Sequence, residues 1–273
     1  MRGVSEFARL GLRTTAHVVD RYAAKGRGIV VLAYHRVGAL TPMAVDLPDA
    51  LFADQMHLLA ESRRVVRLGD ALELLAAPEP PETDPVVVTF DDGTADFLDH
   101  ALPVLRDLGM PATLYVATAF IDEGRPFPHE GRPLSWAALR EAVDTGLVDV
   151  GTHTHSHLLL DRVSGDTARD EFARSVGLVH ERLGVDSVDF AYPKAVAPSA
   201  EVDRIVRSTF RSAALAGTRY NRYGATDPHA LARSPIQVSD GMRWFQRKLE
   251  GGLGLEDRVR TLANRRRYAG ATT

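Results

Sequence analysis

Seven short apolar runs, separated by longer segments with helical periodicity, most restrict the fold of this 273-residue sequence. The runs are continuous rather than alternating, which is typical of strands buried on both faces, as in a parallel sheet. They cover residues 29–34, 86–90, 112–117, 148–152, 188–191, 212–215 and 234–238. Parallel strands that alternate with helices predict an α/β fold with a closed or nearly closed barrel.

Three of the intervening segments have clear helical patterns. Residues 49–62 place their apolar side chains on one face. Residues 135–146 begin at a serine cap, and residues 164–184 stop at a glycine, as helices commonly do. We therefore predict a single barrel domain over 29–240. It would be preceded by a basic helical extension over 1–28 and followed by a basic helical tail over 241–273.

Composition and charge exclude several classes of function. The chain has no cysteine, which excludes thiolate metal sites, iron–sulfur clusters and cysteine nucleophiles. Its net charge of −3 argues against nucleic-acid binding by bulk electrostatics. The basic residues at the two ends are either solvated helix surface or a weak contact with an anionic membrane surface. No signal peptide or spanning segment is recognisable, so we expect a cytoplasmic protein.

Polar side chains follow several of the predicted strands directly. Asp91 and Asp92 follow the run at 86–90, and three alternating histidines follow the run at 148–152. His35 follows the run at 29–34. Because chemistry in β/α barrels gathers where the strands end, we expect these side chains to meet at one face of the barrel.

The histidines and one aspartate have the composition of a metal site. His153 and His157 are four residues apart, so in a helical or tightly turned segment they point the same way. Two imidazoles and a carboxylate form a facial site with open positions; this set favours Zn²⁺, and Co²⁺, Ni²⁺, Mn²⁺ and Fe²⁺ use the same donors. One aspartate would bind the metal, and the other would take a proton from its bound water.

Three ordered motifs give the sequence a family resemblance that extends from about Val30 to Val238. "TFDDG" (89–93), "HTHSH" (153–157) and "FAYPKA" (190–195) resemble the motifs of the NodB-homology polysaccharide deacetylases, carbohydrate esterase family 4. The resemblance implies a distorted, TIM-barrel-like (β/α)7 barrel in a single domain. It also implies metal-dependent hydrolysis of an N-acetyl group on an amino-sugar polysaccharide, oligosaccharide or glycoconjugate.

The resemblance also implies roles for individual residues. Asp91 would be the general base, and the metal ligands would be Asp92, His153 and His157. Substrate and oxyanion contacts would come from the loop at Tyr192, Pro193 and Lys194, where a backbone N–H near Lys194 would hold the oxyanion.

The sequence departs from the family pattern at two places. Many members have an arginine that orients the base where this chain has Ala191, and many have a late histidine that supplies the acid. We expect Arg233 to replace the arginine and His35 to supply the acid. The alternatives are a surface cation for Arg233 and a hydrogen-bonded structural residue for His35.

Two other functions remain open at this point. The same metal site in this fold could hydrolyse a small cyclic amide or ureide. The two departures would also fit a catalytically impaired relative that only binds carbohydrate.

Overall fold

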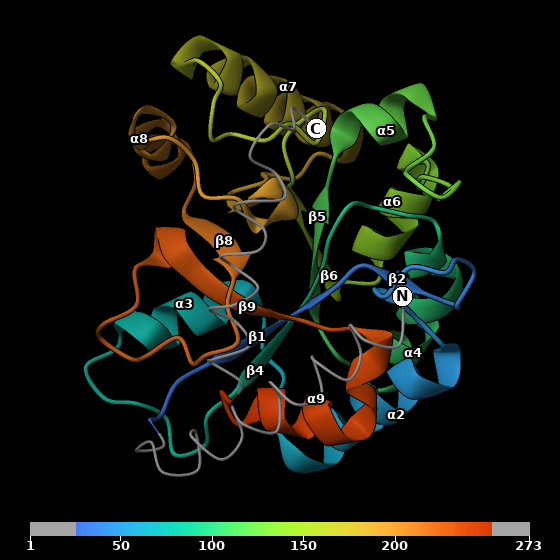
Figure 1. Ribbon diagram of the computed structural model, residues 1–273, viewed down its shortest axis with the longest axis vertical. Helices are drawn as coiled ribbons and strands as arrows, with labels where there is room; N and C mark the ends of the chain where they lie inside the picture. The colour runs from blue at the N-terminus through green and yellow to red at the C-terminus, as the bar shows by residue number, and fades with distance from the viewer. Residues whose placement is uncertain (1–25, 253–273) are drawn as a thin grey trace, which may run out of the picture.

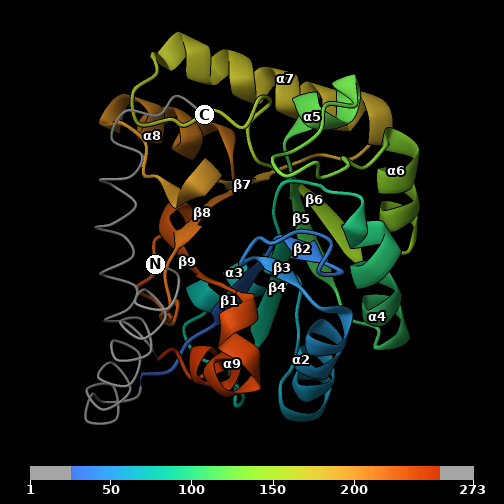
Figure 2. The same cartoon turned by 45° about the vertical axis from the view of Figure 1, so that its right-hand side comes forward.

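The computed structural model describes residues 26–252 as a closed barrel of seven parallel strands surrounded by helices (Figures 1 and 2). The barrel strands are β1 (Val30–Tyr34), β4 (Val86–Phe90), β5 (Ala112–Val116), β6 (Val148–Thr152), β7 (Asp189–Ala191), β8 (Ser212–Ala216) and β9 (Leu231–Pro235). They lie side by side in sequence order, and β1 pairs with both β4 and β9, which closes the barrel. The predicted α/β barrel is confirmed.

The last strand was predicted in the wrong place. It covers Leu231–Pro235, whereas the apolar run had indicated 234–238. Pro235 lacks a backbone N–H and ends the strand, and the following residues turn into a short 3-10 helix at Val238–Asp240. Arg233 therefore lies in the middle of a buried strand, one residue before the predicted run.

Eight helices are described around the barrel. They are α2 (Asp49–Ser62), α3 (Leu68–Ala76), α4 (Leu102–Asp107), α5 (Thr118–Glu123), α6 (Trp136–Asp144), α7 (Gly165–Leu183), α8 (Ala200–Thr209) and α9 (Gly241–Leu249). A two-stranded ribbon, β2 (Arg36–Val37) with β3 (Asp46–Leu47), follows β1. The three predicted helices are present: Ser135 and Ser164 cap α6 and α7, and Gly184 ends α7 in the left-handed region.

The apolar core is divided among three layers. The inside of the barrel is filled mainly by side chains from six strands, and α3 packs against this cluster. A second cluster lies between the barrel and helices α2, α4, α6 and α9, and a third lies between β7, α7 and α8. Because both strand faces are buried, the strands read as continuous apolar runs in the sequence.

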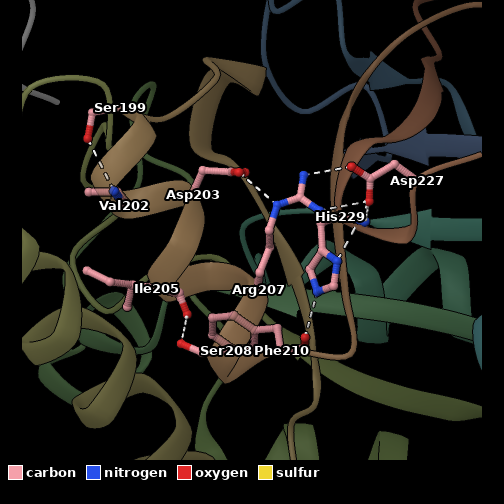
Figure 3. Close-up of polar contacts among 9 residues, drawn as sticks. All are labelled: Ser199, Val202, Asp203, Ile205, Arg207, Ser208, Phe210, Asp227 and His229. Carbon is pink, nitrogen blue, oxygen red and sulfur yellow. Dashed lines mark hydrogen bonds and ion pairs between the residues drawn. The ribbon is translucent and has the colours of Figure 1, made fainter.

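Strand β9 is held at both ends by charged side chains. Before the strand, Arg207 on α8 donates to both carboxylate oxygens of Asp227 at 3.1 and 2.6 Å, and His229 contacts the carbonyl of Phe210 (Figure 3). After it, the buried ammonium of Lys248 donates to the carbonyl of Pro235 and to Asp240, each at 2.6 Å. These contacts fix the strand that carries Arg233.

The two ends of the chain were predicted to be basic and helical. Residues 1–25 and 253–273, which carry most of the basic residues concerned, lie outside the described part of the chain. Within the predicted tail, Gly241–Leu249 forms α9 and packs on the core beside α2. Among residues 26–252, no helix combines the length and apolar character needed to cross a bilayer.

The two ion pairs at the ends of β9, Lys248–Asp240 and Arg207–Asp227, are expected to contribute differently to stability. Replacement of Lys248 by Met removes a 3% exposed ammonium from a fully buried Asp240 carboxylate, and should lower the free energy of unfolding by roughly 3–5 kcal/mol. Replacement of Arg207 by Met removes a 40% exposed side chain and should cost about 1 kcal/mol or less. Urea unfolding of the two variants measures the difference, and equal losses would contradict it.

Candidate active site

Five of the predicted site residues lie in the loops that follow three barrel strands, and Arg233 lies within a fourth strand. Asp91 and Asp92 follow β4, and His153 follows β6. His35 follows β1, and Arg233 projects from β9, which pairs with β1. The closed barrel therefore brings together residues that lie far apart in the sequence, as the strand-end argument predicted.

Asp91 is held by a buried, bidentate ion pair. Arg233 donates to its two carboxylate oxygens at 2.6 and 2.9 Å, and both side chains are no more than 5% exposed. The Nε2 atom of His35 lies 3.8 Å from Oδ2 of Asp91. Burial by itself raises the pKa of Asp91, but Arg233 and the nearby histidines outweigh it and hold this pKa below its usual value. Asp91 is therefore ionised at neutral pH.

Thr89 is a contact that the sequence argument missed. Its hydroxyl accepts a 3.2 Å hydrogen bond from Arg233 and donates to the carbonyl of Leu32 at 2.7 Å. Thr89 and Asp91 are two residues apart at the end of β4, so both face the barrel interior. The two-residue spacing in the sequence could therefore have indicated that Thr89 lies on the same face as Asp91.

Asp92 and two histidines form a compact donor set. One ligand atom from each of Asp92, His153 and His157 lies within 4.8 Å of the others. The Nε2 atoms of His153 and His157 lie 3.8 and 3.5 Å from Oδ1 of Asp92. Two imidazoles and one carboxylate match the donors that Zn²⁺ and similar divalent ions use. The three side chains therefore fit a divalent cation.

The backbone around this donor set is strained. Asp92, Thr154 and His157 have positive φ angles of 72°, 59° and 63°, which are uncommon for residues with a side chain. Of the two predicted alternatives, a helical or a tightly turned segment, the histidines lie in a turned segment that is not helical. Two left-handed residues redirect the loop, and the Thr154 hydroxyl accepts from Leu158 N–H at 2.9 Å. Such strain concentrates at functional sites.

The two imidazoles are held neutral and oriented. Nδ1 of His153 lies 2.7 Å from the carbonyl of Ala191, which places the proton on Nδ1 and leaves the Nε2 lone pair facing Asp92. Burial lowers the pKa of His153, and it lowers the pKa of His157 to about 3. Both side chains are therefore available as ligands without losing a proton.

The residues between these histidines anchor the loop. Nδ1 of His155 lies 2.9 Å from the hydroxyl of Thr118 on α5. Ser156 donates to Glu171 on α7 through its backbone N–H and its hydroxyl, at 2.8 and 2.9 Å. His155 faces α5, away from the donor set, and the loop is fixed to two helices.

The loop after β7 places its three predicted residues differently. The buried ring of Tyr192 packs on Phe190, with centroids 4.9 Å apart, in the cluster under α8, so the structure does not bring it to the site. Lys194 has a φ of 52° and an exposed side chain, and its charge helps lower the pKa of Asp92 and His157. Pro193 precedes it and is buried.

Two stacked aromatic rings lie beside His157. Phe120 on α5 stacks on Phe127 at a centroid distance of 4.1 Å and meets the His157 ring edge-on at 6.5 Å. Phe127 belongs to the loop 122–133, which Arg36 fixes by a 2.8 Å hydrogen bond to the carbonyl of Pro128. Through the stacked Phe120 ring, this loop lies close to His157.

Comparisons with known proteins point to one family of enzymes. The family model described as polysaccharide deacetylase matches residues 79–213. YxkH of Bacillus subtilis (strain 168), named as a polysaccharide deacetylase, is 26% identical over 237 residues, covering 84% of this chain and 77% of its own. The structure of IcaB from Ammonifex degensii superposes with a TM-score of 0.72 and 27% identity, over 82% of this chain and 98% of that one.

This chain belongs to the polysaccharide deacetylase family. The deacetylase PplD of Streptococcus pyogenes, solved with acetate, shares the fold with a TM-score of 0.68 at 20% identity, over 86% of this chain and 98% of that one. Membership of the polysaccharide deacetylases supports an enzyme that acts on an acetylated carbohydrate.

Metal binding by the donor set can be tested on individual histidines. Replacement of His157 by Ala removes a ligand and should weaken Zn²⁺ binding by roughly 100-fold or more, because even the outer partners of metal ligands are worth about 10- to 100-fold. Replacement of His155 by Ala, in the same motif, should cost no more than about tenfold. Calorimetric titration measures both, and a reversed order would contradict the assignment.

The pH dependence of metal binding is a second expectation. Protons compete with the metal for neutral imidazole, and a pKa of about 3 for His157 leaves it neutral well below pH 6. The Zn²⁺ affinity should therefore change by less than about tenfold between pH 7.5 and pH 5. Two histidines with ordinary pKa values near 6.5 would lose roughly a thousandfold by pH 5. A competition titration with a chelator distinguishes these outcomes.

Proposed function

We propose that this chain is a metal-dependent hydrolase that removes N-acetyl groups from an amino-sugar-containing polysaccharide, oligosaccharide or glycoconjugate. The observation that carries the proposal is the division between two adjacent carboxylates. Asp91 pairs with Arg233, and Asp92 faces His153 and His157. Asp91 is therefore separate from the donor set and can accept a proton.

The first step is the attack of water on the acetyl carbonyl. Asp92, His153 and His157 would hold the cation, with Zn²⁺ favoured by these donors and Co²⁺, Ni²⁺, Mn²⁺ or Fe²⁺ as alternatives. A divalent cation in such a site acidifies water and polarises a carbonyl oxygen. Asp91 takes the proton of the attacking water, and the backbone N–H of Lys194 donates to the developing oxyanion.

The low pKa of Asp91 fits this role. Arg233 keeps the carboxylate ionised and fixes both of its oxygens, so Asp91 is in its proton-accepting form throughout the neutral range. A carboxylate of low pKa is a weak base, so it depends on a water that has been made more acidic. The proposed dependence on a metal is consistent with this low basicity.

The second step is the loss of the amine. The C–N bond breaks, acetate forms, and the nitrogen of the sugar needs a proton. His35 lies 3.8 Å from Asp91, its side chain is 27% exposed, and no late histidine exists in the "LARSPIQV" segment to take this role. We assign the general acid to His35.

The geometry does not favour the two alternatives. A catalytically impaired relative was suggested by the missing arginine before Pro193, but Arg233 makes the corresponding contact with Asp91 from β9. No feature of the described site specifically favours a cyclic amide or ureide. Assays on acetylglucosamine oligomers and on cyclic imides, each with added Zn²⁺ or Co²⁺, compare these substrate classes directly.

The base is tested by Asp91→Asn, which keeps the size of the side chain. Acetate release from acetylglucosamine oligomers should fall by roughly 100- to 10,000-fold, while Zn²⁺ binding persists because Asp92 and the histidines are unchanged. The control is Asp99→Asn, an exposed carboxylate that pairs with Arg132 at 2.5 Å. Unchanged acetate release in the Asp91 variant would refute the assignment.

The role of His35 as the general acid can be tested with two substrates whose leaving groups differ in their need for a proton. His35→Gln should lower the release of acetate from an N-acetyl sugar by roughly 100-fold or more, because an amine cannot leave without a proton. An aryl acetate, whose phenolate leaves unprotonated, should be hydrolysed by the variant at nearly the wild-type rate. If the variant loses both activities equally, His35 has another role.

A further inference from the structure

Tyr115 occupies the centre of the barrel below the site. It lies on β5, its side chain is fully buried, and it packs with inward-facing residues of five other strands. These residues are Val31, Val87, Ala191, Ala214 and Leu231. An aromatic ring therefore fills the barrel directly beneath the carboxyl ends of the strands.

The barrel makes room for this ring at one specific position. A Cβ atom on Gly151 of β6 would lie 2.5 Å from Cδ1 of Tyr115 and 2.9 Å from the backbone oxygen of Asp189. No side chain fits there without a shift of the ring or the strand. The absence of a side chain at Gly151 thus leaves the space that the Tyr115 ring occupies.

The ring of Tyr115 contacts the guanidinium that holds the base. The central carbon of the Arg233 guanidinium lies 5.1 Å from the ring centroid, which is within the range of a cation–π contact. The other described contacts of this guanidinium are Asp91 and the hydroxyl of Thr89. Its Nε atom has no hydrogen-bond partner among residues 26–252. Within residues 26–252, the ring thus joins Asp91 and Thr89 as a contact of the guanidinium.

The hydroxyl of Tyr115 contributes less than the ring. It is buried and makes no hydrogen bond within the described part of the chain. A buried hydroxyl without a partner opposes folding, so the hydroxyl does not explain a tyrosine here. What Tyr115 offers Arg233 is an aromatic face.

We propose that Tyr115 is a positioning residue for deacetylation: its ring holds the Arg233 guanidinium in the orientation that grips both oxygens of Asp91. This inference rests on the proposed role of Asp91 as the base. If the guanidinium tilts, one of the two hydrogen bonds to Asp91 is lost and the carboxylate can turn away from its water. Misplacement of a catalytic group by about 1 Å can cost roughly 100-fold in rate.

The test compares Tyr115→Leu with Tyr115→Phe. The leucine variant lacks an aromatic face, and its kcat for acetylglucosamine oligomers should fall by roughly 10- to 100-fold, with KM nearly unchanged. The phenylalanine variant keeps the face and should recover kcat to within about threefold of wild type. Phe172→Leu, a buried aromatic residue on α7, controls for core damage and should lower stability but not kcat.

A double-mutant cycle shows whether Tyr115 acts through Arg233. In an Arg233→Lys background, where there is no planar guanidinium to hold, Tyr115→Leu should change kcat by less than about threefold. An undiminished loss in that background would overturn the proposal, as would wild-type kcat in Tyr115→Leu itself. If the leucine variant does not fold, Tyr115→Met takes its place, since methionine adapts to the same space.

A crystal structure separates this inference from the proposed function. In Tyr115→Leu the two hydrogen bonds between Arg233 and Asp91 should no longer both be present, and in Tyr115→Phe they should be. This result is independent of acetate release. An inactive wild-type enzyme would count against the proposed function alone, whereas an unchanged ion pair in Tyr115→Leu would overturn the positioning role.

Discussion

Arg233 and Asp91 are both buried inside the barrel, and neither charge could remain there at low cost without the other. Backbone pairing of β1 with both β4 and β9 closes the barrel. The ion pair of Arg233 and Asp91 spans β9 and β4 across β1, so the position of the candidate base depends on that closure. The pair also explains the electrostatics of the site, because the guanidinium keeps Asp91 ionised in surroundings that would otherwise favour its neutral form.

Two neighbouring carboxylates serve separate purposes because the backbone turns between them. Asp91 follows β4 with its side chain directed into the barrel, toward Arg233. Asp92 has a φ of 72°, which turns its side chain toward His153 and His157. Repulsion between adjacent aspartates is offset on one side by the guanidinium and, in the proposed enzyme, on the other by a divalent cation. The strain at Asp92 is part of this arrangement.

Much of the fold and the grouping of the site followed from the sequence. Continuous apolar runs identified the strands, and polar residues directly after them indicated which end of the barrel holds the candidate site. The sequence misplaced β9, because an arginine inside an apolar segment reads as a break until its partner is known. That partner, Asp91, is 142 residues away in the sequence.

Other features depend on backbone angles and packing that residue spacing does not reveal. The spacing of His153 and His157 suggested a helical or tightly turned segment, but it did not reveal that two left-handed residues make the turn. The family resemblance placed Tyr192 at the site, but its side chain points to the α8 side of the strand. The sequence did not indicate a role for Tyr115, because an aromatic residue within an apolar strand is typical of the hydrophobic core.

The central claim is that the two aspartates divide their roles, and a crystal structure of the Zn²⁺-loaded protein with anomalous scattering data tests it most directly. The account predicts one strong anomalous peak within coordination distance of Asp92, His153 and His157. Asp91 should remain paired with Arg233 through both oxygens, outside the coordination sphere. A peak coordinated by Asp91, or a metal bound away from these histidines, would contradict it.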